Sequence, residues 1–398
     1  MFLTASLLTG VLIAADSRST PTYTKDIAPI LNQRCVECHR KGEAAPMAFT
    51  SYSETRPWAA AIKEATASKV MPPWFAHGSE GNFKNDRRLA QAEIDTLAAW
   101  AKAGAPEGDP KELPRMPEFA DGWNIGKPDM VFDTGKEFPI PADGVVAYQY
   151  FPVPTNFTED RWIEAAEVRP QNRQATHHIN VFLVEPGRAK NDARPFLVGW
   201  APGVQPLALE PGTASLIKKG TVLLFQAHYT PNGKGATDRS FVGLRFAKEP
   251  PKLRSITESA ANNSFKIPPN AGNHEVRSEW IAKYDVDLFA MMPHMHLRGK
   301  DFRFLIHFPD GRETMILDVP RFDFNWQLGY ELKQALKLPK GTRIECIAHF
   351  DNSKNNKFNP DSGKEISWGD QTFEEMMIGF FLYKIPVTPA ASPAPSGA

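Results

Sequence analysis

The stretch Met291-Met292-Pro293-His294-Met295-His296-Leu297-Arg298-Gly299-Lys300 lies between two runs typical of β-strands. Residues 284–292 are largely apolar, and residues 301–308 are rich in aromatic and β-branched side chains before a Pro-Asp-Gly turn. Alternate side chains of a strand project from the same face, so His294 and His296 can reach one metal ion. The stretch therefore predicts a β domain carrying two imidazole ligands; two polar residues on an exposed strand face are the alternative.

The overall composition indicates a multidomain protein without a polyanionic partner. The chain has 398 residues, enough for two to three domains, and Lys+Arg and Asp+Glu both total 46. This balance does not favour binding to nucleic acid or to an anionic membrane surface. With three cysteines, two of them in one short motif, an intramolecular disulfide framework is excluded.

The amino-terminal residues 1–15 are apolar and end in small residues, which is typical of a secretory signal peptide cleaved near Ala14 or Ala15. A buried amino-terminal segment is the alternative, because no Lys or Arg precedes the apolar run. The run is too short to span a bilayer, and no later stretch is long and apolar enough. We therefore expect an exported protein, periplasmic or secreted, without a membrane span.

The sequence Cys35-Val36-Glu37-Cys38-His39 is the C-x-x-C-H attachment pattern of a c-type haem. Cys35 and Cys38 would form the thioether links, and His39 would be the proximal iron ligand. A redox dithiol or half of a zinc site are the competing interpretations. A zinc site needs a second ligand pair, and the remaining cysteine, Cys346, lies far downstream.

Helix signals surround this motif and predict a small all-α domain over residues 20–108. Residues 24–32 form a short helical run, and Ser51 with Glu54 makes a capping-box pattern ahead of residues 58–68. Apolar residues recur at helical spacing near residues 94–101, before Gly and Pro stop signals. A helix, the haem motif, loops and a closing helix resemble a class I cytochrome c.

A sixth haem ligand is expected on a loop after the motif. Met71, in Val-Met-Pro-Pro-Trp, is the best candidate, because a thioether on a proline-stiffened loop can be held against the iron. Met47 is the alternative and His77 a third choice. Histidine and methionine together would give an electron-transfer haem of raised potential.

The rest of the chain divides by composition. Residues 109–136 are rich in Pro, Gly and charge and are predicted to be a linker, and residues 386–398 a disordered tail. Between them, short apolar or alternating runs separated by Pro/Gly turns indicate antiparallel β-sandwiches. A Pro-rich break at residues 249–251 divides them into domains over 137–251 and 252–385. The clearest predicted strands are 176–184, 221–229, 285–292, 302–308, 343–350 and 376–383.

The first β domain contains the adjacent pair His177-His178 and, further on, His228 with Gln226 on the same strand face. Adjacent side chains of a regular strand point to opposite faces, so both can bind one metal only if the strand bends or begins there. Alternatively, one histidine is a ligand and the other is structural. With His294 and His296, five histidines form three local motifs and no carboxylate is placed among them.

Imidazoles alone, or with a thioether, suit copper, and methionine favours Cu(I). Zinc hydrolases normally show H-E-x-x-H or a carboxylate ligand. The candidate thioether lies in the segment Trp368-Gly-Asp-Gln-Thr-Phe-Glu-Glu-Met376-Met377.

These motifs, in this order, resemble the copper type II, ascorbate-dependent monooxygenases that include peptidylglycine α-hydroxylating and dopamine β-monooxygenase. The resemblance covers roughly residues 138–383: a His-His pair, Q-x-H-Y, H-x-H and E-E-M. It implies two jelly-roll domains with two coppers facing across a solvent-filled cleft. It assigns His177, His178 and His228 to an electron-transfer copper. The oxygen-activating copper would be held by His294, His296 and Met376, with Met377 the alternative in register.

The chain departs from the family in ways that bear on substrate. The peptide-hydroxylating members hold a substrate carboxylate with Arg, Asn and Tyr, where this chain has Met292, Ile378 and Phe380. A small neutral or apolar organic substrate is therefore expected, together with O2 and an external reductant such as ascorbate or a redox protein. Family members are also rich in disulfides. His274, His307 and His349 match no ligand position and are expected to be structural.

The sequence thus predicts a copper monooxygenase that hydroxylates an activated C–H bond, with Gln226 beside its metal ligands and a fused c-type haem delivering electrons. The rival hypothesis is a non-catalytic electron carrier or copper-binding protein in which β domains hold metal beside a cytochrome.

Overall fold

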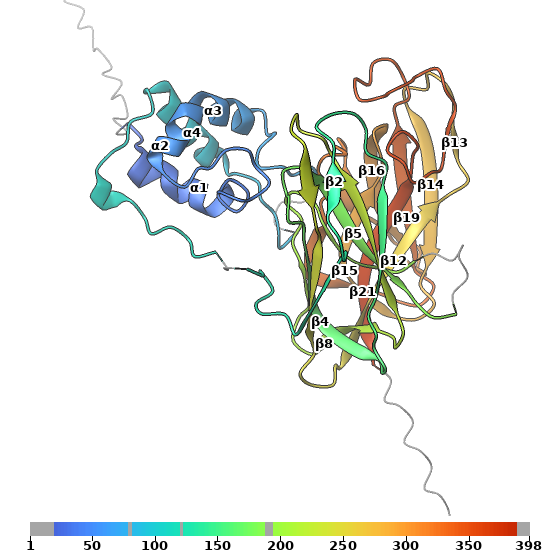
Figure 1. Cartoon of the computed structure of the whole chain (residues 1–398). Coiled ribbons are helices and arrows are strands. Elements are labelled where there is room, and N and C mark those ends of the chain that lie inside the picture. The colour runs from blue at the N-terminus through green and yellow to red at the C-terminus, as the bar shows by residue number, and fades with distance from the viewer. Residues whose placement is uncertain (1–19, 79–81, 120–121, 188–193, 388–398) are drawn as a thin grey trace, which may run out of the picture.

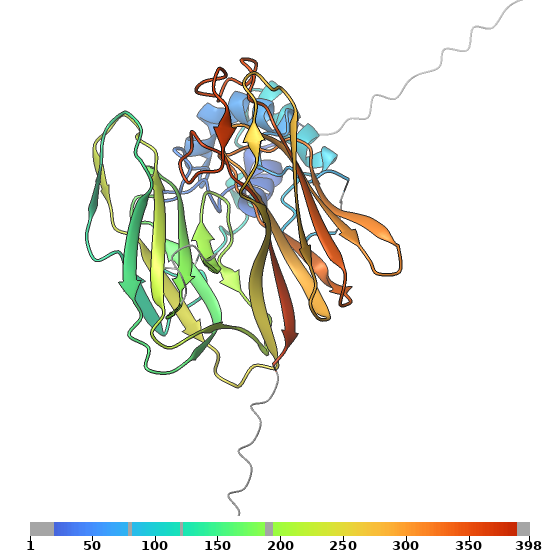
Figure 2. The same cartoon turned by 90° about the vertical axis from the view of Figure 1, so that its right-hand side faces the viewer.

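The computed structural model describes residues 20–78, 82–119, 122–187 and 194–387. The helices form one body and the strands form two sandwiches that lie side by side, as the two views show (Figures 1 and 2). The predicted signal peptide, residues 1–15, lies outside the described residues. Among those residues, no helix is both long enough and apolar enough to cross a membrane.

The helical module surrounds the C-x-x-C-H motif. Ser51 Oγ accepts a hydrogen bond from Glu54 N, which caps α2 as the capping-box pattern predicts. The core of the helical module includes Ile27, Leu31, Leu97 and Trp100, all fully buried. The helical elements are η1 (Tyr23–Ile27), α1 (Ala28–Arg34), α2 (Tyr52–Thr55), η2 (Arg56–Trp58), α3 (Ala59–Ala67), α4 (Gln91–Lys102) and η3 (Pro110–Glu112).

The first sandwich packs the strands β1-β11-β4-β8 against a four-stranded sheet of order β3-β9-β5-β6. Alternating apolar side chains from both layers, such as Val168, Val181 and Phe225, meet in its core. Its strands are β1 (Met130–Asp133), β2 (Phe138–Ile140), β3 (Gln149–Pro154), β4 (Arg161–Arg169), β5 (Thr176–Val184), β6 (Phe196–Trp200), β7 (Leu207–Ala208), β8 (Thr213–Ile217), β9 (Val222–Tyr229), β10 (Ala236–Asp238) and β11 (Phe241–Phe246).

The second sandwich packs β12-β21-β15-β18 against β14-β19-β16-β17. A short parallel pairing of β8 with β12, Thr213 opposite Leu253, joins the two sandwiches through one continuous sheet. Its strands are β12 (Leu253–Asn262), β13 (Lys266–Ile267), β14 (His274–Ile281), β15 (Val286–His294), β16 (Gly299–His307), β17 (Glu313–Val319), β18 (Tyr330–Leu338), β19 (Arg343–Phe350), β20 (Ile366–Ser367) and β21 (Met377–Pro386).

The predicted β-sandwich character of the chain is confirmed, whereas the jelly-roll connectivity and the cytochrome c assignment remain predictions. Two predicted boundaries need correction. Residues 130–133 of the predicted linker form β1, because their backbone pairs with β11. Pro386, the first residue of the predicted tail, ends β21, and Val387 N donates to Lys252 O. Residues 388–398 lie outside the described part of the chain.

Part of the predicted cytochrome domain belongs to the second sandwich instead. Trp74 and Phe83 are buried in its core, with ring centroids 5.0 Å and 5.6 Å from that of Tyr330. Lys84 N donates to Glu331 O, and Lys333 N donates to Asn82 O. Because full burial of one such aromatic side chain stabilises by about 2–3 kcal/mol, this segment fixes the helical module against the β part.

Candidate metal centres

The first histidine set forms where β5 is irregular. The register of β5 against β9 shifts between Thr176 and His178, and His178 then lies opposite His228. This irregularity is the bend that the adjacent histidines require. The Nδ1 atoms of His177 and His178 are 3.1 Å apart, and one ligand nitrogen from each of the three histidines lies within 4.8 Å of the others.

The nitrogens of this set fit a metal ion. Nitrogens about 2.0–2.1 Å from one metal lie about 3 Å apart, so three histidines whose ligand nitrogens fall within 4.8 Å of one another can close on one ion. Nε2 of His177, Nε2 of His178 and Nδ1 of His228 are buried and have no hydrogen-bond partner among the described residues. Burial lowers the pKa of His177 to about 4 and that of His228 to about 3, and it holds the pKa of His178 well below its usual range. All three imidazoles are therefore neutral near pH 7, the form that binds metal.

The second set consists of His294 and His296, with ring centroids 5.2 Å apart. The strand β15 ends at His294, so the expectation that both lie on one regular strand is wrong for His296. His294 Nδ1 lies 2.6 Å from Gln327 Oε1, and His296 Nδ1 lies 3.2 Å from the Glu374 carbonyl oxygen. These contacts fix Nδ1 as the protonated nitrogen of each ring and leave Nε2 as the donor for a metal.

The Nε2 atom of His296 is buried without a partner among the described residues. Burial lowers the pKa of His294, and it lowers the pKa of His296 to about 3. Like the first set, this pair is neutral near pH 7 and offers unprotonated nitrogens.

A buried carboxylate holds the loop that carries His296. Glu375 accepts hydrogen bonds from His296 N at 2.8 Å and from Arg298 N at 2.6 Å, and the Arg298 guanidinium lies 3.9 Å away. Both side chains are almost completely inaccessible to water, and burial raises the pKa of Glu375 to about 8. Arg298 also donates to Phe373 O and to Asn352 Oδ1. Glu375 therefore sets the position of His296 although it is not itself a ligand.

The two neighbouring methionines of the E-E-M segment face opposite ways. Met376 lines the same cavity as His294, whereas Met377 is buried in the core, where Ser278 Oγ donates to its Sδ at 3.2 Å. The geometry therefore favours Met376 over Met377 as the thioether near His294, and its ligation remains a prediction.

A cavity of about 670 Å³ lies between the two sandwiches and reaches both histidine sets. His178 and Gln226 line it from the first sandwich, and His294 and Met376 line it from the second. Its remaining wall is mixed: Arg194, Asn263 and Asp370 are polar lining residues, and apolar side chains lie near the second set. The apolar lining residues there are Met292, Ile378, Phe380 and Phe196.

A chain of polar side chains crosses this cavity. Asn180 Nδ2 donates to Gln226 Oε1, Gln226 Nε2 donates to the Tyr150 hydroxyl, and that hydroxyl donates to Asp370 in the second sandwich. Gln226 is thus held by two partners of the first sandwich, and one of them, Tyr150, bonds in turn to Asp370 of the second sandwich.

Two aromatic side chains fill the space between the histidine sets on the other side. The Tyr148 ring lies 4.7 Å from the His228 ring and 6.5 Å from the His296 ring. The Phe324 ring stacks on His177 at 4.7 Å and lies 5.8 Å from His296. The expected solvent-filled cleft therefore does not separate the two sets completely, because the Tyr148 and Phe324 rings lie between them.

In the helical module the cysteines of the haem motif are not paired with each other, and burial raises the pKa of Cys35 to about 12. His39 Nδ1 lies 3.3 Å from the Met47 carbonyl oxygen, and its ring stacks on Phe49 with centroids 4.4 Å apart. The residues fit a haem, because this contact leaves Nε2 of His39 for the iron.

The contact with His39 bears on the sixth ligand. It places the Met47 backbone on the side of the imidazole remote from Nε2, whereas a sixth ligand must lie beyond the iron. Met47 is therefore poorly placed, and Met71 remains the predicted ligand. His77 N donates to Asp318 O of the second sandwich, and the His77 side chain is 77% exposed, away from the motif.

Two of the three histidines that match no ligand motif, His307 and His349, have acidic partners. His307 Nε2 lies 2.7 Å from Glu345, and His349 Nδ1 lies 2.7 Å from Asp301. Sequence reasoning missed four residues that shape the candidate site. They are Tyr148, Phe324, Gln327 and Glu375. Of these four, only Glu375 lies in a sequence motif that indicates a site, because it precedes the candidate ligand Met376 in E-E-M.

Comparisons with known proteins give one sequence relative. DBH-like monooxygenase protein 1 of Homo sapiens is 32% identical over 113 residues, which are 27% of this chain and 17% of that protein. The chain thus matches less than a fifth of that relative's length. No family model matches the chain.

The structural comparisons are weak. The infectious bursal disease virus VP2 subviral particle gives a TM-score of 0.22 at 9% identity, covering 67% of this chain and 74% of that one. The major capsid protein P2 of bacteriophage PM2 gives 0.25 at 8% identity, covering 68% and 100%. Scores this low carry no conclusion about this chain.

Proposed function

We propose that the chain is a copper-dependent monooxygenase that inserts one oxygen atom of O2 into an activated C–H bond. One observation carries the proposal: a single cavity reaches two sets of neutral imidazoles, through His178 of the first and His294 of the second, and in each set buried ring nitrogens have no partner among the described residues. The similarity to a DBH-like monooxygenase supports copper and this class of oxidoreductase.

The first set, His177, His178 and His228, would hold an electron-transfer copper. His294, His296 and Met376 would hold the copper beside which the substrate reacts. When bound, the two ions store the two electrons that the hydroxylation requires, one at each set. The chain's own groups supply fixed, neutral nitrogens and a soft thioether, and Glu375 and Gln327 orient the second pair.

The cavity wall indicates the substrate class. Met292, Ile378 and Phe380 line it beside His294, so a substrate carboxylate placed against these side chains would lose its hydration without being paired by them. The proposed substrate is therefore a small neutral or apolar molecule. Asn180 and Gln226, with the Tyr150 hydroxyl, offer it neutral hydrogen-bonding groups. Arg194 also lines the cavity and is the cation that a carboxylate elsewhere in it would meet.

The helical module would carry a c-type haem on Cys35, Cys38 and His39 with Met71 as sixth ligand. It would pass electrons from an external reductant, such as ascorbate or a redox protein, to the first copper. The fixed contact between the helical module and the β part supports this role, because a tethered donor acts at high effective concentration. Covalent haem attachment also fits the predicted periplasmic or secreted location.

The proposal is tested by loading the holoprotein with copper and measuring reductant-dependent O2 uptake. Uptake that rises with a neutral hydroxylatable substrate, and that is lost in His294→Ala, is expected. His274→Ala, a change at a histidine outside both sets, is the matched control. Two coppers per chain with no substrate-dependent uptake would instead favour the non-catalytic electron carrier or copper-binding protein.

A further inference from the structure

The loop of the haem motif lies against the first sandwich. Gln205 Nε2 donates to Glu37 Oε1 at 2.6 Å, and Arg87 lies 3.6 Å from the same carboxylate. Arg173, just before β5, donates to Glu43 at 2.6 Å. These contacts place the C-x-x-C-H loop next to the residues that follow β6.

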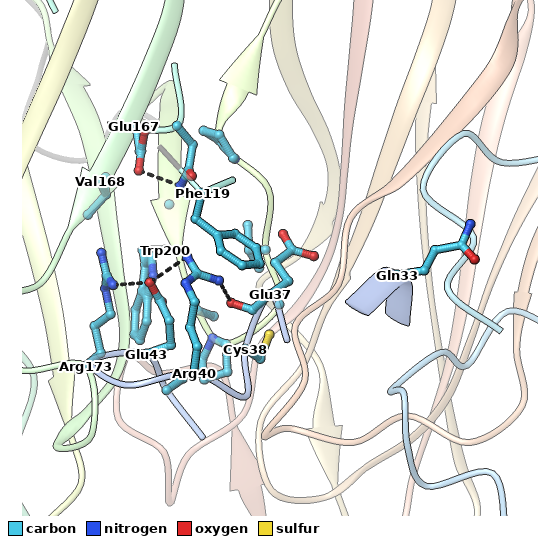
Figure 3. Close-up of a pocket in the computed structure, with 18 of the residues that line it drawn as sticks. Gln33, Glu37, Cys38, Arg40, Glu43, Phe119, Glu167, Val168, Arg173 and Trp200 are labelled. Carbon is cyan, nitrogen blue, oxygen red and sulfur yellow. Dashed lines mark hydrogen bonds and ion pairs between the residues drawn. The ribbon is translucent and has the colours of Figure 1, made fainter. Parts of the chain in front are cut away.

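A cavity of about 370 Å³ lies at this junction (Figure 3). Cys38 of the haem motif and Arg40, which follows the motif, line it from the helical module, and Trp200, the last residue of β6, lines it from the first sandwich. The same stretch of chain also borders the larger cavity between the histidine sets. The residues shared by both cavities are Gly199, Trp200, Ala201 and Val204. This stretch is therefore the wall between the haem motif and the candidate metal centres.

Trp200 is also next to the first histidine set through the backbone. It is the cross-strand partner of Ile179 in β5, and Ile179 follows His178 directly. The two strands are closely packed here, since a Cβ added at Gly199 would lie 2.8 Å from Asn180 Oδ1 and 3.2 Å from Ile179 O. A path from the cavity at Cys38 to His178 would therefore run through the Trp200 indole, across the β6–β5 pairing to Ile179, and along one peptide unit to His178.

We propose that Trp200 is the relay through which electrons pass from the haem motif to the metal held by His177, His178 and His228. This inference rests on the proposed function, because it assumes a haem at Cys35–His39 and copper at the first set. In the step, one electron leaves ferrous haem, which becomes ferric, and one cupric ion becomes cuprous. No bond forms or breaks, and Trp200 is unchanged at the end.

The experiment uses the full chain with haem and copper bound. The haem is reduced rapidly without O2, and its reoxidation is followed by absorbance in wild type, Trp200→Leu, Trp200→Phe and Trp58→Leu. Trp58 is an exposed tryptophan of the helical module and is the matched control. Copper content, the haem spectrum and the melting temperature are measured for each variant, so that a folding defect is recognised.

Trp200→Leu is expected to slow copper-dependent reoxidation several-fold with copper content and haem spectrum unchanged. Trp200→Phe should retain an intermediate rate, and Trp58→Leu the wild-type rate. If Trp200→Leu and wild type reoxidise equally fast and both need copper, the relay is wrong and the haem-to-copper proposal stands. If wild-type reoxidation is the same with and without copper, electron delivery to copper fails, and the relay fails with it.

Discussion

Glu375 gives the sharpest test of how the second histidine set is built. Both of its carboxylate oxygens accept a backbone N–H, from His296 and from Arg298, in a site closed to water. In Glu375→Gln the amide has one acceptor oxygen, so one of these N–H groups must face an NH2 donor. Leaving a buried N–H donor without an acceptor costs about 1–3 kcal/mol.

The expected loss of stability is therefore about 1–3 kcal/mol. At roughly 2–4 °C per kcal/mol, this corresponds to a melting temperature lower by about 2–12 °C. Because His296 is held through the same contact, copper bound should fall from two ions to one per chain, with the first set still loaded. Calorimetry and metal analysis of the purified variant measure both effects.

Glu374→Gln is the control, because Glu374 is the neighbouring carboxylate and is only partly buried. It accepts from Gln371 N and supplies its carbonyl oxygen, not its side chain, to His296. A Glu375→Gln protein that melts like wild type and keeps both coppers would refute the role given to Glu375. Equal losses in the control would refute its specificity.

Other predictions test the remaining parts of the account. Met376→Ile should weaken Cu(I) binding at the second set, measured by competition with a Cu(I) chelator, and leave the first set and the haem intact. If Met377→Ile weakens Cu(I) binding instead, the assignment of the two methionines is reversed. The unfolded chain binds more protons than the folded metal-free protein between the ordinary histidine pKa of 6.5 and the lowered value of about 3 for His228. The metal-free protein should therefore lose stability as pH falls from 6.5 towards 4, and His228→Gln should melt with a shallower pH dependence; parallel curves would contradict this. A small alkylaromatic substrate should be turned over far better than a glycine-extended peptide, as chromatography of the products would show; efficient peptide hydroxylation would overturn the proposed substrate class.

The sequence predicted much of this arrangement because its signals are local. The capping box at Ser51, the strand over residues 343–350 and the need for a bend at His177-His178 follow from residue type and spacing, and the structure contains all three. The opposite orientation of Met376 and Met377 follows from strand alternation in the same way.

What the sequence left out depends on contacts between distant segments. Tyr148 and Phe324 meet the histidines only because the two sandwiches come together, and neither residue has a local motif. Trp74 and Phe83 lie within the predicted cytochrome domain but complete the core of the second sandwich, which periodicity cannot reveal. Glu375 belongs to the E-E-M segment in sequence, but its burial with Arg298 appears only in three dimensions.

The central claim, oxygen insertion at a copper site, is tested most directly by isotope labelling. Copper-loaded, reduced protein is exposed to 18O2 with a panel of small neutral substrates, and the products are analysed by mass spectrometry. One 18O atom per product molecule is predicted, with none in the copper-free protein or in His294→Ala. Product that lacks the label, or labelling that persists after copper is removed, would contradict the proposed function.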